Sequence, residues 1–322
     1  MVRAEEALLA TALIATCYRE ASAIDEFLDA VVSQTRRPDE IVIVDGGSDD
    51  GTAERIKERI SGGAVVRLVV EPGANRSRGR NRAVEETTAE IIAVTDVGAR
   101  PRKDWFERIV APLEADPEIE VVAGYYEADA RTAWEAAVAG ATVPRAEEVN
   151  PETFLPSARS VAFRRAAWQR AGKYPEHLSH NEDTPFGLAL KASGAKFVFE
   201  PRAVVVWRPQ ATPWRLFRQF YRYALGDAEA GIWFRHYAKA YLVFGVAAGL
   251  VVAWGWWPLG RWLLFGLALA YWARHAARAF RRTRSLGAAL LAPLANAIVD
   301  FAHVAGYTRG LLRRRDHAAG GH

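Results

Sequence analysis

Single acidic side chains end two apolar runs in the N-terminal third of the chain, a pattern that places charge where chemistry is expected. Asp45 closes the run 41–45, and Asp96 follows the uncharged, mostly β-branched run 91–95. Such runs predict strands that are buried on both faces of a parallel sheet. Because ligands of open α/β sheets bind beyond the carboxyl ends of the strands, we expect both carboxylates in a binding site. The alternative for Asp96 is an ordinary turn or helix-capping aspartate.

A cluster of arginines stands between these two acids in the sequence. It comprises Arg76, Arg78, Arg80 and Arg82. The surrounding pattern predicts that a helix begins here. Guanidinium groups at a helix start suit a phosphate ligand, through bidentate hydrogen bonds and the positive end of the helix dipole. A solvated basic turn is the alternative, and an anionic ligand is the interpretation we favour.

The order of apolar runs and helical patterns predicts the fold that must position these groups. Strands are expected at 8–15, 41–45, 65–70 and 91–96, and they alternate with helices across short polar turns. The first of these helices is expected to begin after a cap at Ser22. Alternation of this kind indicates right-handed βαβ units and a doubly wound, mostly parallel sheet. The sequence has neither GxGxxG after the first strand nor GxxxxGK[ST], so a dinucleotide fold and a P-loop are not indicated.

Composition narrows the class of protein. The chain has 322 residues, of which half are hydrophobic and a quarter charged, with a net charge of +4. That size allows two domains, or one domain and a membrane appendage. Its single cysteine, Cys17, excludes an intrachain disulfide, and the acids before the first apolar run do not suit a signal peptide. Arginines gather beside hydrophobic runs in the C-terminal third, which favours anionic lipid over nucleic acid as a partner.

Four segments resemble the nucleotide-sugar half of the family-two, GT-A fold glycosyltransferases. They are Thr16–Glu20, Val44–Thr52, Gly79–Ala83 and Thr95–Gly98. Each is short, but their order and spacing make the resemblance specific. It implies a GT-A catalytic domain over residues 1–207, with a nucleotide-sugar half at 1–126 and an acceptor half at 127–207. It also implies transfer of a sugar from a UDP- or GDP-linked donor to a hydroxyl, with inversion at the anomeric carbon.

The resemblance assigns donor-side roles to residues near the strand ends and to a later helix. The implied donor-binding residues are Thr16, Glu20, Asp45, Gly46, Ser48, Arg80, Asp96, Gln219 and Arg222. Asp45 would help to hold the base and ribose, and Arg80 would approach the diphosphate or the sugar. Asp96 would hold Mg²⁺ or Mn²⁺ through oxygen, as hard cations prefer.

A second pair of acids follows the expected strand 157–165. Glu182 and Asp183 resemble the family's "ED" motif, in which the aspartate is the catalytic base. The resemblance therefore makes Asp183 the base and places Glu182 and Ser160 on the acceptor side. The alternative is a pair of first-turn acids that complement a helix dipole. Residues 127–156 lack a clean period and are expected to form an acceptor-site loop or lid.

The sequence departs from the family pattern in three places. The family's DxD has become Asp96-Val97-Gly98, so metal binding would rest on one carboxylate and the diphosphate, or arginines would do part of the work. Gly46 follows Asp45 where many relatives have a second acid that reads uracil, which leaves the base preference open. Trp207 ends the last predicted strand where relatives often supply a histidine as a metal ligand.

The stretch 208–239 predicts an amphipathic helix in the membrane interface. Arginines there alternate with aromatic residues over 208–223, a composition that suits the plane of an interface. Gln219-Phe220-Tyr221-Arg222-Tyr223 resembles the QxxRW element of membrane-bound sugar polymerases, with Tyr in place of Trp. The resemblance makes Arg222 a candidate pyrophosphate contact. Simple interfacial anchoring is the alternative.

Residues 240–315 predict a membrane region that precedes a tail at 316–322. No charge occurs in 240–257, and a helix of that length spans about 27 Å, close to the hydrocarbon thickness of a bilayer. With 262–273 it predicts a membrane hairpin, and the belt of Trp254, Trp256 and Trp257 fits its far end.

The basic stretch 274–284 predicts a cytoplasmic loop, and so places the catalytic domain on the cytosolic side of the cytoplasmic membrane. Segment 286–307 carries one polar face and arginines at both ends. We expect it to be interfacial or re-entrant. A third span is the alternative for this segment, and a soluble helical core is the alternative for 240–307 as a whole.

Two classes of function remain in view. The first is a membrane-associated inverting glycosyltransferase that acts on a lipid-linked or membrane-proximal acceptor, and the second is a degenerate relative that serves as a membrane scaffold. Retention of Arg80, Asp96 and Asp183 favours the enzyme. A sugar nucleotidyltransferase would require a glycine-rich turn after the first strand, which Thr16–Glu20 does not provide. A polyprenyl phosphate acceptor needs no base, so Asp183 favours a hydroxyl acceptor.

Overall fold

The computed structural model describes residues 9–178, 180–255 and 257–319, and the chain divides into two compact units. The first unit comprises the residues up to Glu127 and Val149–Trp207, and the second comprises Ala128–Glu148 and the residues from Arg208 onward. Leu8 at the predicted start of the first strand, the N-terminal acids, Trp256 of the predicted belt and residues 320–322 of the predicted tail lie outside the described residues.

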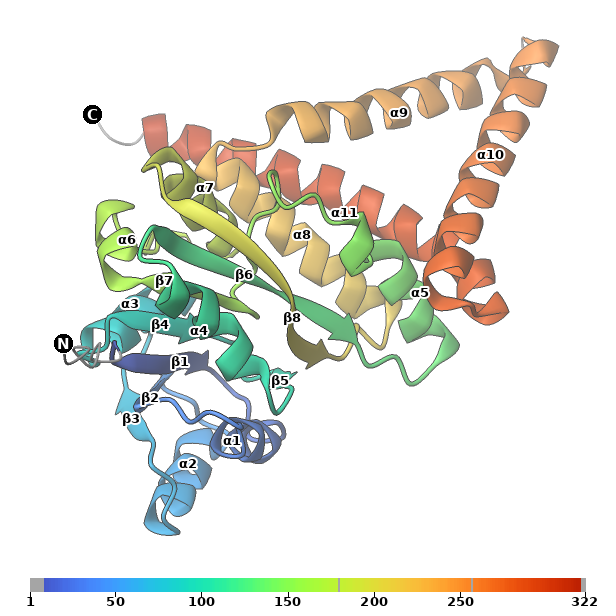
Figure 1. Ribbon diagram of the computed structural model, residues 1–322. Coiled ribbons are helices and arrows are strands. Elements are labelled where there is room, and N and C mark those ends of the chain that lie inside the picture. The colour runs from blue at the N-terminus through green and yellow to red at the C-terminus, as the bar shows by residue number, and fades with distance from the viewer. Residues whose placement is uncertain (1–8, 179, 256, 320–322) are drawn as a thin grey trace. The chain divides into compact units, whose positions relative to one another are not determined.

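In the described part of the chain, an eight-stranded sheet forms the centre of the first unit, in the order β3-β2-β1-β4-β7-β6-β8-β5 (Figure 1). The strands are β1 (Thr11–Cys17), β2 (Glu40–Asp45), β3 (Arg67–Val70), β4 (Ile91–Val94), β5 (Ala99–Pro101), β6 (Ile119–Ala128), β7 (Val161–Arg164) and β8 (Lys196–Trp207). Strands β1 to β4 pair in parallel, whereas β7 is antiparallel to β4 and β6, and β5 is antiparallel to β8. The sheet is therefore mixed rather than mostly parallel, because βαβ alternation extends only to β4.

Helices cover both faces of this sheet. The helices packed on one face are α1 (Ile24–Val32), α2 (Thr52–Ser61) and α4 (Trp105–Ala115), and those on the other are α3 (Arg76–Glu85), α6 (Arg165–Arg170) and α7 (Asp183–Ala192). Side chains of β1 alternate between the two layers, with Leu13 and Ala15 in the first and Ala12 and Ile14 in the second. This is the two-residue period of a strand that is buried on both faces. The predicted α/β fold is confirmed.

Some predicted boundaries were wrong. Helix α1 begins at Ile24, so Ala23 occupies the N-cap position that was predicted for Ser22. The methyl group of Ala23 makes no capping hydrogen bond. The last predicted strand does end at Trp207, as part of the single continuous strand β8 (Lys196–Trp207). Residues 127–156 were expected to be a loop. They contain the helix α5 (Ala133–Thr142), whose alanines leave no clear polar and apolar period.

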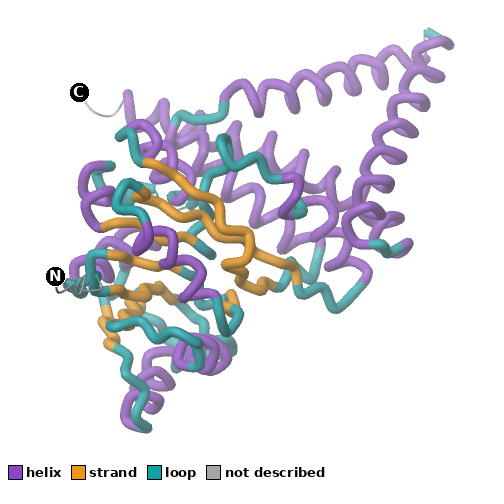
Figure 2. Tube along the Cα trace, viewed as in Figure 1, coloured by secondary structure: helices purple, strands orange, loops and turns teal. Residues whose placement is uncertain are grey.

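The second unit is dominated by helices, as Figure 2 shows. Beside α5 and the short 3₁₀ turns Ala146–Glu148 and Ala253–Gly255, it contains α8 (Pro213–Ala230), α9 (Phe234–Val252), α10 (Pro258–Thr283) and α11 (Leu286–Ala319). Helix α11 packs along α8, α5 and α10. A Cβ on Gly306 would lie 2.2 Å from the carbonyl oxygen of Tyr221, so α8 and α11 pack closely at a position only glycine allows.

The two segments of the predicted membrane hairpin, 240–257 and 262–273, fall largely on helices α9 and α10, and neither helix is shown to cross a membrane. Helix α9 ends at Val252, so it contains only part of the uncharged run 240–257. Helix α10 continues to Thr283, so most of the basic stretch 274–284 is helical instead of a loop. Among the described helices, only the stretch Leu286–Arg314 of α11 is long and apolar enough to cross a membrane, judged by length and composition, and 39% of its apolar window lies buried within the protein.

Candidate functional site

The loops that follow β1, β2 and β4 meet at the carboxyl edge of the parallel strands. Cys17 at the end of β1 lies beside Asp45 at the end of β2. Asp96 follows the end of β4 by two residues. Helix α3 approaches the same edge closely at Gly79, where an added Cβ would lie only 2.8 Å from Cγ2 of Thr16. The structure therefore brings Thr16, Asp45 and Asp96 to one edge of the sheet.

Asp45 stabilises the loop after β2 through hydrogen bonds to its side chain. Its Oδ1 accepts hydrogen bonds from the backbone N–H groups of Gly47 (2.9 Å) and Ser48 (2.7 Å). Its Oδ2 accepts from the Ser48 hydroxyl (2.6 Å) and the Cys17 thiol (3.3 Å). Burial, together with the charge of Asp45, raises the pKa of the Cys17 thiol and keeps it protonated as a donor. The side chain of Asp45 is fully buried, and these contacts use the acceptor positions of a carboxylate. In this structure Asp45 and Ser48 shape the loop.

The start of that loop lies against the segment after β1. Gly46 is buried, and its N–H donates to the carbonyl of Cys17 (2.9 Å). A Cβ on Gly46 would lie 2.9 Å from the carbonyl oxygen of Ala74, so a second acid at this position would need the backbone to move. Beside it, the ring of Tyr18 is 54% exposed. This edge therefore presents an accessible aromatic face that sequence reasoning did not single out.

Arg80 lies between two carboxylates. Its Nη2 donates to Oδ1 of Asp96 at 3.0 Å, and its Nη1 is paired with Glu182. The guanidinium carbon is 5.5 Å from the centroid of the Tyr174 ring. Burial lowers the pKa of Arg80, but the charges of Glu182 and Asp96 outweigh this effect and raise it above its ordinary value. The side chains of Arg80 and Glu182 are 2% and 4% exposed, whereas Asp96 is 35% exposed and keeps an open side.

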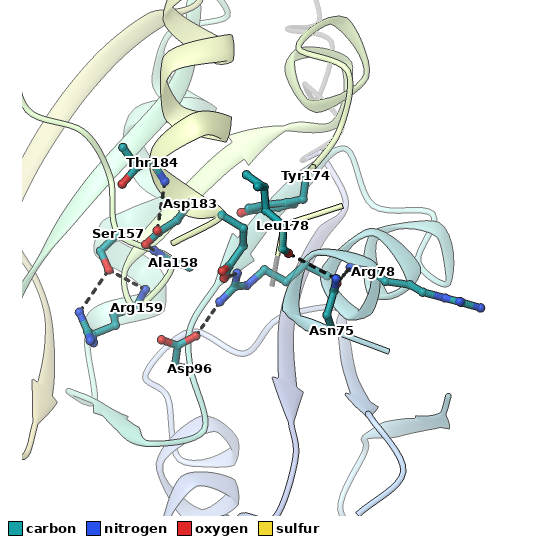
Figure 3. A network of polar contacts seen from close by, with 12 residues as sticks. Asn75, Arg78, Asp96, Ser157, Ala158, Arg159, Tyr174, Leu178, Asp183 and Thr184 are labelled. Carbon is teal, nitrogen blue, oxygen red and sulfur yellow. Dashed lines mark hydrogen bonds and ion pairs between the residues drawn. The ribbon is translucent and has the colours of Figure 1, made fainter. Parts of the chain in front are cut away.

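Asp96 is the carboxylate best placed to meet a ligand (Figure 3). Burial raises its pKa, but Arg80, Arg159 and Arg76 together hold that pKa below its ordinary value, so the group is ionised at neutral pH. Burial raises the pKa of Glu20, and the charge of Asp96 raises it further, so the two carboxylates act on each other electrostatically.

The carboxylate of Asp96 fits a role as one oxygen ligand of Mg²⁺ or Mn²⁺. Within residues 9–178, 180–255 and 257–319, no group of three or more His, Cys, Asp or Glu is placed to hold a metal ion. Mg²⁺ is often held by one or two carboxylates together with substrate phosphates. A cation bound here would therefore take most of its ligands from the substrate.

The other arginines of α3 are placed differently from Arg80. Arg78 pairs with Glu71, and Arg82 pairs with Glu86 one helical turn later. Arg76 is exposed and acts on the pKa of both Asp96 and Glu20. The predicted cluster therefore divides into one buried site arginine, one exposed arginine near the site, and two surface ion pairs.

Asp183 begins α7 and receives backbone hydrogen bonds on both oxygens. The N–H of Ala158 donates to its Oδ2 at 3.2 Å, and the N–H of Thr184 donates to its Oδ1 at 3.0 Å (Figure 3). Burial raises the pKa of Asp183, and so does the charge of Glu182, while Arg80 and Arg159 oppose them. A carboxylate with a raised pKa is suited to general-base work near neutral pH.

The two residues predicted on the acceptor side are both buried. Glu182 is directed to Arg80, as described above. The Ser160 hydroxyl accepts from Nε1 of Trp105 (2.8 Å) and donates to the carbonyl of Ala203 (3.1 Å). With 1% exposure, Ser160 does not line an acceptor site. Its role is to join α4 to β8, because the start of β7 turns this side chain inward.

Arg159 is a site residue that sequence reasoning missed. Its guanidinium carbon lies 5.3 Å from the ring centroid of Tyr126 and 4.9 Å from that of Trp207. Its charge lowers the pKa of both Asp96 and Asp183. The sequence placed Arg159 in an expected strand at 157–165, whereas β7 begins at Val161, so only the fold shows the position of Arg159. Trp207, at the position where a histidine was the family expectation, supplies one of the two rings.

Gln219 and Arg222 lie on α8 in the second unit. Nε2 of Gln219 donates to the hydroxyl of Tyr223 at 2.8 Å. The amphipathic helix predicted from 208 begins at Pro213 and is capped by the side chain of Thr212. The donor-binding roles of Gln219 and Arg222 stay predictions.

Comparison with known proteins identifies the family. Residues 12–170 match the family described as Glycosyl transferase family 2. The chain is 27% identical over 326 aligned residues to the succinoglycan biosynthesis protein ExoA of Rhizobium meliloti, covering 94% of this chain and 96% of that protein. It is 24% identical over 246 residues to glycosyltransferase AglE of Haloferax volcanii, covering 74% of this chain and 79% of that protein.

Solved structures show the same fold. The mannosyltransferase PcManGT from Pyrobaculum calidifontis, in complex with GDP-Man and Mn²⁺, matches with a TM-score of 0.64 at 22% identity, covering 91% of this chain and 88% of that one. GalNAc-T7 with UDP, GalNAc and Mn²⁺ matches with a TM-score of 0.53 at 17% identity, covering 76% and 51%. The chain belongs to glycosyltransferase family 2, has the GT-A fold and transfers a sugar from a nucleotide-sugar donor.

Proposed function

We propose that this chain is an inverting, membrane-associated glycosyltransferase that moves a hexosyl unit from a UDP- or GDP-linked sugar to a hydroxyl of a lipid-linked or membrane-proximal acceptor. The observation that carries the proposal is the placement of Asp183. Its pKa is raised, and the buried ion pair of Glu182 and Arg80 connects its helix to Asp96. Ion pairs through Arg80 thus connect the proposed base Asp183 with the proposed donor-side carboxylate Asp96 within the first unit.

The donor would lie across the carboxyl edge of β1, β2 and β4. In this proposal Thr16 and Glu20 would meet the base and ribose, beside the loop that Asp45 holds through hydrogen bonds from Gly47 and Ser48. The exposed ring of Tyr18 offers a face on which a base can stack.

The diphosphate would lie beside Asp96. If bound, Mg²⁺ or Mn²⁺ would be held by Asp96 and would neutralise charge on the leaving diphosphate. Arg80 and Arg76 add positive charge on the same side. Preorganised charge of this kind stabilises the leaving group as the bond to the sugar breaks.

The chemistry is a single displacement. The acceptor oxygen attacks the anomeric carbon from the face opposite the diphosphate, and its proton passes to the carboxylate of Asp183. The bond between the anomeric carbon and the phosphate oxygen breaks, and the electron pair leaves with the diphosphate. Inversion at the anomeric carbon follows from the single step.

Membrane association is supported by the second unit. The stretch Leu286–Arg314 is long and apolar enough to cross a membrane. Helices α9 and α10 also expose large apolar side chains, among them Leu242, Val243, Val252, Trp262, Phe265 and Leu269. Arg274 and Arg281 of α10 are exposed as well, which suits an anionic cytoplasmic leaflet. Because arginines beside membrane segments favour the cytoplasmic side, we propose that the catalytic unit lies on the cytosolic side.

Replacement of the base tests the proposal. Asp183→Asn should lower kcat by two or more orders of magnitude and leave the KM for the donor near that of the wild type, since the amide cannot accept the proton. The measurement is turnover of a radiolabelled nucleotide sugar in membranes that contain the full chain. Asp104→Asn, at a partly exposed acid that precedes α4 and pairs with Arg108, is the matched control. Unchanged turnover of Asp183→Asn would remove Asp183 as the base.

A further inference from the structure

We propose that Arg159 binds a phosphate oxyanion in the space between Asp96 and Asp183. The inference rests on the proposed function and adds to it a residue that no motif identified. It follows from the backbone position of Arg159, from the two rings that hold its guanidinium, and from the balance of charge around Asp96.

The backbone places Arg159 between the two carboxylates. Its neighbour Ala158 donates a hydrogen bond to Asp183 at 3.2 Å. Trp207 is paired with Ala99, three residues after Asp96, through the register of β5 and β8. Since the guanidinium lies over the Trp207 ring, the side chain extends from the base toward the loop that carries Asp96. Figure 3 shows Arg159 on the same side of the site as Asp96 and Asp183.

Two aromatic rings hold the guanidinium in place. Tyr126 and Trp207 lie within 5.3 and 4.9 Å of its central carbon, and the Ser157 hydroxyl lies 3.5 Å from its Nη1. Contacts of this kind reduce the entropy lost when a ligand binds, because the side chain is already ordered. A guanidinium held over rings keeps its N–H donors in its own plane, the geometry that bidentate phosphate recognition uses.

The charges around Asp96 require a cation of this kind. The charge of Asp96 raises the pKa of Glu20, so these two carboxylates act on each other, and a phosphate beside Asp96 would add further negative charge. Arg80 is engaged by Asp96 and Glu182 on its two terminal nitrogens. Arg159 acts electrostatically on both Asp96 and Asp183, so it adds positive charge to that of Arg80 on this side of the site.

Two sources could present the oxyanion, namely the diphosphate of the donor and the phosphate of a lipid-linked acceptor. Both would be recognised by the same chemistry. The experiment therefore follows both sources separately.

The test is calorimetric titration of the full chain in nanodiscs with UDP, GDP, uridine and guanosine, each with Mn²⁺. Arg159→Ala should weaken binding of the preferred nucleoside diphosphate at least tenfold and leave the matching nucleoside unchanged. Arg202→Ala, an exposed arginine of β8 paired with Glu200, is the matched control and should change neither. In a parallel arm, the full chain is held in detergent micelles and titrated with undecaprenyl phosphate instead of the nucleotides.

The outcomes separate the two claims. If Arg159→Ala weakens binding of the nucleoside diphosphate, the donor diphosphate is the ligand of Arg159. If it weakens binding of undecaprenyl phosphate, the phosphate of the acceptor is the ligand. Unchanged phosphate binding in both arms, in a folded Arg159→Ala protein that still binds nucleotide, overturns the Arg159 proposal alone. An equal loss for the nucleoside also overturns it, because the effect would then be structural. A wild-type chain that binds no nucleotide contradicts the proposed function itself.

The two aromatic rings give a second test. Trp207→Leu should weaken the same phosphate-dependent binding severalfold, since the guanidinium loses one ring, while Trp207→Phe should restore most of it. Equal effects of both substitutions would show that the ring does not act through Arg159.

Discussion

At the scale of single residues, the candidate site is a chain of charges that leads from Asp96 to Asp183, the proposed base. Asp96, Arg80 and Glu182 are linked by ion pairs, and Asp183 follows Glu182 in the sequence. Buried ion pairs offset their own desolvation only when both partners stay in place, and removal of one partner typically costs about 3–5 kcal/mol. Arg80 has two such partners, so it is expected to hold its position when one is neutralised.

The pH dependence of activity tests this network. Asp183 acts when it has lost its proton, so kcat/KM should rise with pH through its raised pKa. Glu182→Gln removes a negative charge that raises this pKa and leaves the positive charges of Arg80 and Arg159 in place. The acid limb of the pH profile should therefore move to lower pH. Glu120→Gln, at a surface pair with Arg170, is the control.

Circular dichroism of the Glu182→Gln protein should show a folded chain, since Arg80 keeps Asp96 as a partner. If the folded Glu182→Gln protein has its acid limb of kcat/KM at the same pH as the wild type, Glu182 does not raise the pKa of Asp183.

The sequence could predict the residues that stand at strand ends or helix starts. Asp45, Asp96 and Asp183 each sit at such a boundary, where apolar periodicity stops. It could not predict that Arg80 pairs with Glu182, because these residues are 102 positions apart and only the packed fold brings them together. Arg159 was missed for the same reason.

At the scale of elements, close packing of α3 against β1 positions Arg80. Gly79→Ala would place a methyl group 2.8 Å from Cγ2 of Thr16. Overpacking of this kind costs about 1–3 kcal/mol, against a gain in helix propensity of about 1 kcal/mol. We expect a net loss in the free energy of unfolding, measured by urea denaturation.

The control for this change is Gly62→Ala at the end of α2, where a Cβ would meet only ordinary contacts at 3.5 Å. That substitution should leave the urea midpoint within error of the wild type. A Gly79→Ala protein as stable as the wild type would show that α3 can shift away from β1 without loss.

Prediction of elements worked where the apolar period was clear and failed where it was not. The strands β1, β2 and β4 are continuous apolar runs, and their order was predicted. Helix α5 is rich in alanine on all sides, so its residues gave no period. The antiparallel half of the sheet could not be predicted, because the direction of β7 and β8 depends on tertiary pairing rather than on local pattern.

At the scale of the whole molecule, the second unit is the part expected to meet lipid. Charge-only attachment would be screened by salt, whereas apolar contact would not. We therefore expect the full chain to remain in the membrane pellet after washing with 1 M NaCl. Release into the supernatant would contradict apolar association and favour purely electrostatic attachment through the arginines of α10.

The measurement that tests the central claim most directly is a thermal-shift titration of the full chain with UDP, GDP and dTDP, each with and without Mn²⁺. A ligand that binds only the folded state stabilises it by about 2.7 kcal/mol at a concentration of 100 times its Kd. We predict a rise in Tm with UDP or GDP, and a Mn²⁺-dependent part of that rise that is lost in Asp96→Asn. A folded wild-type chain whose Tm responds to no nucleotide, with or without Mn²⁺, would contradict the account.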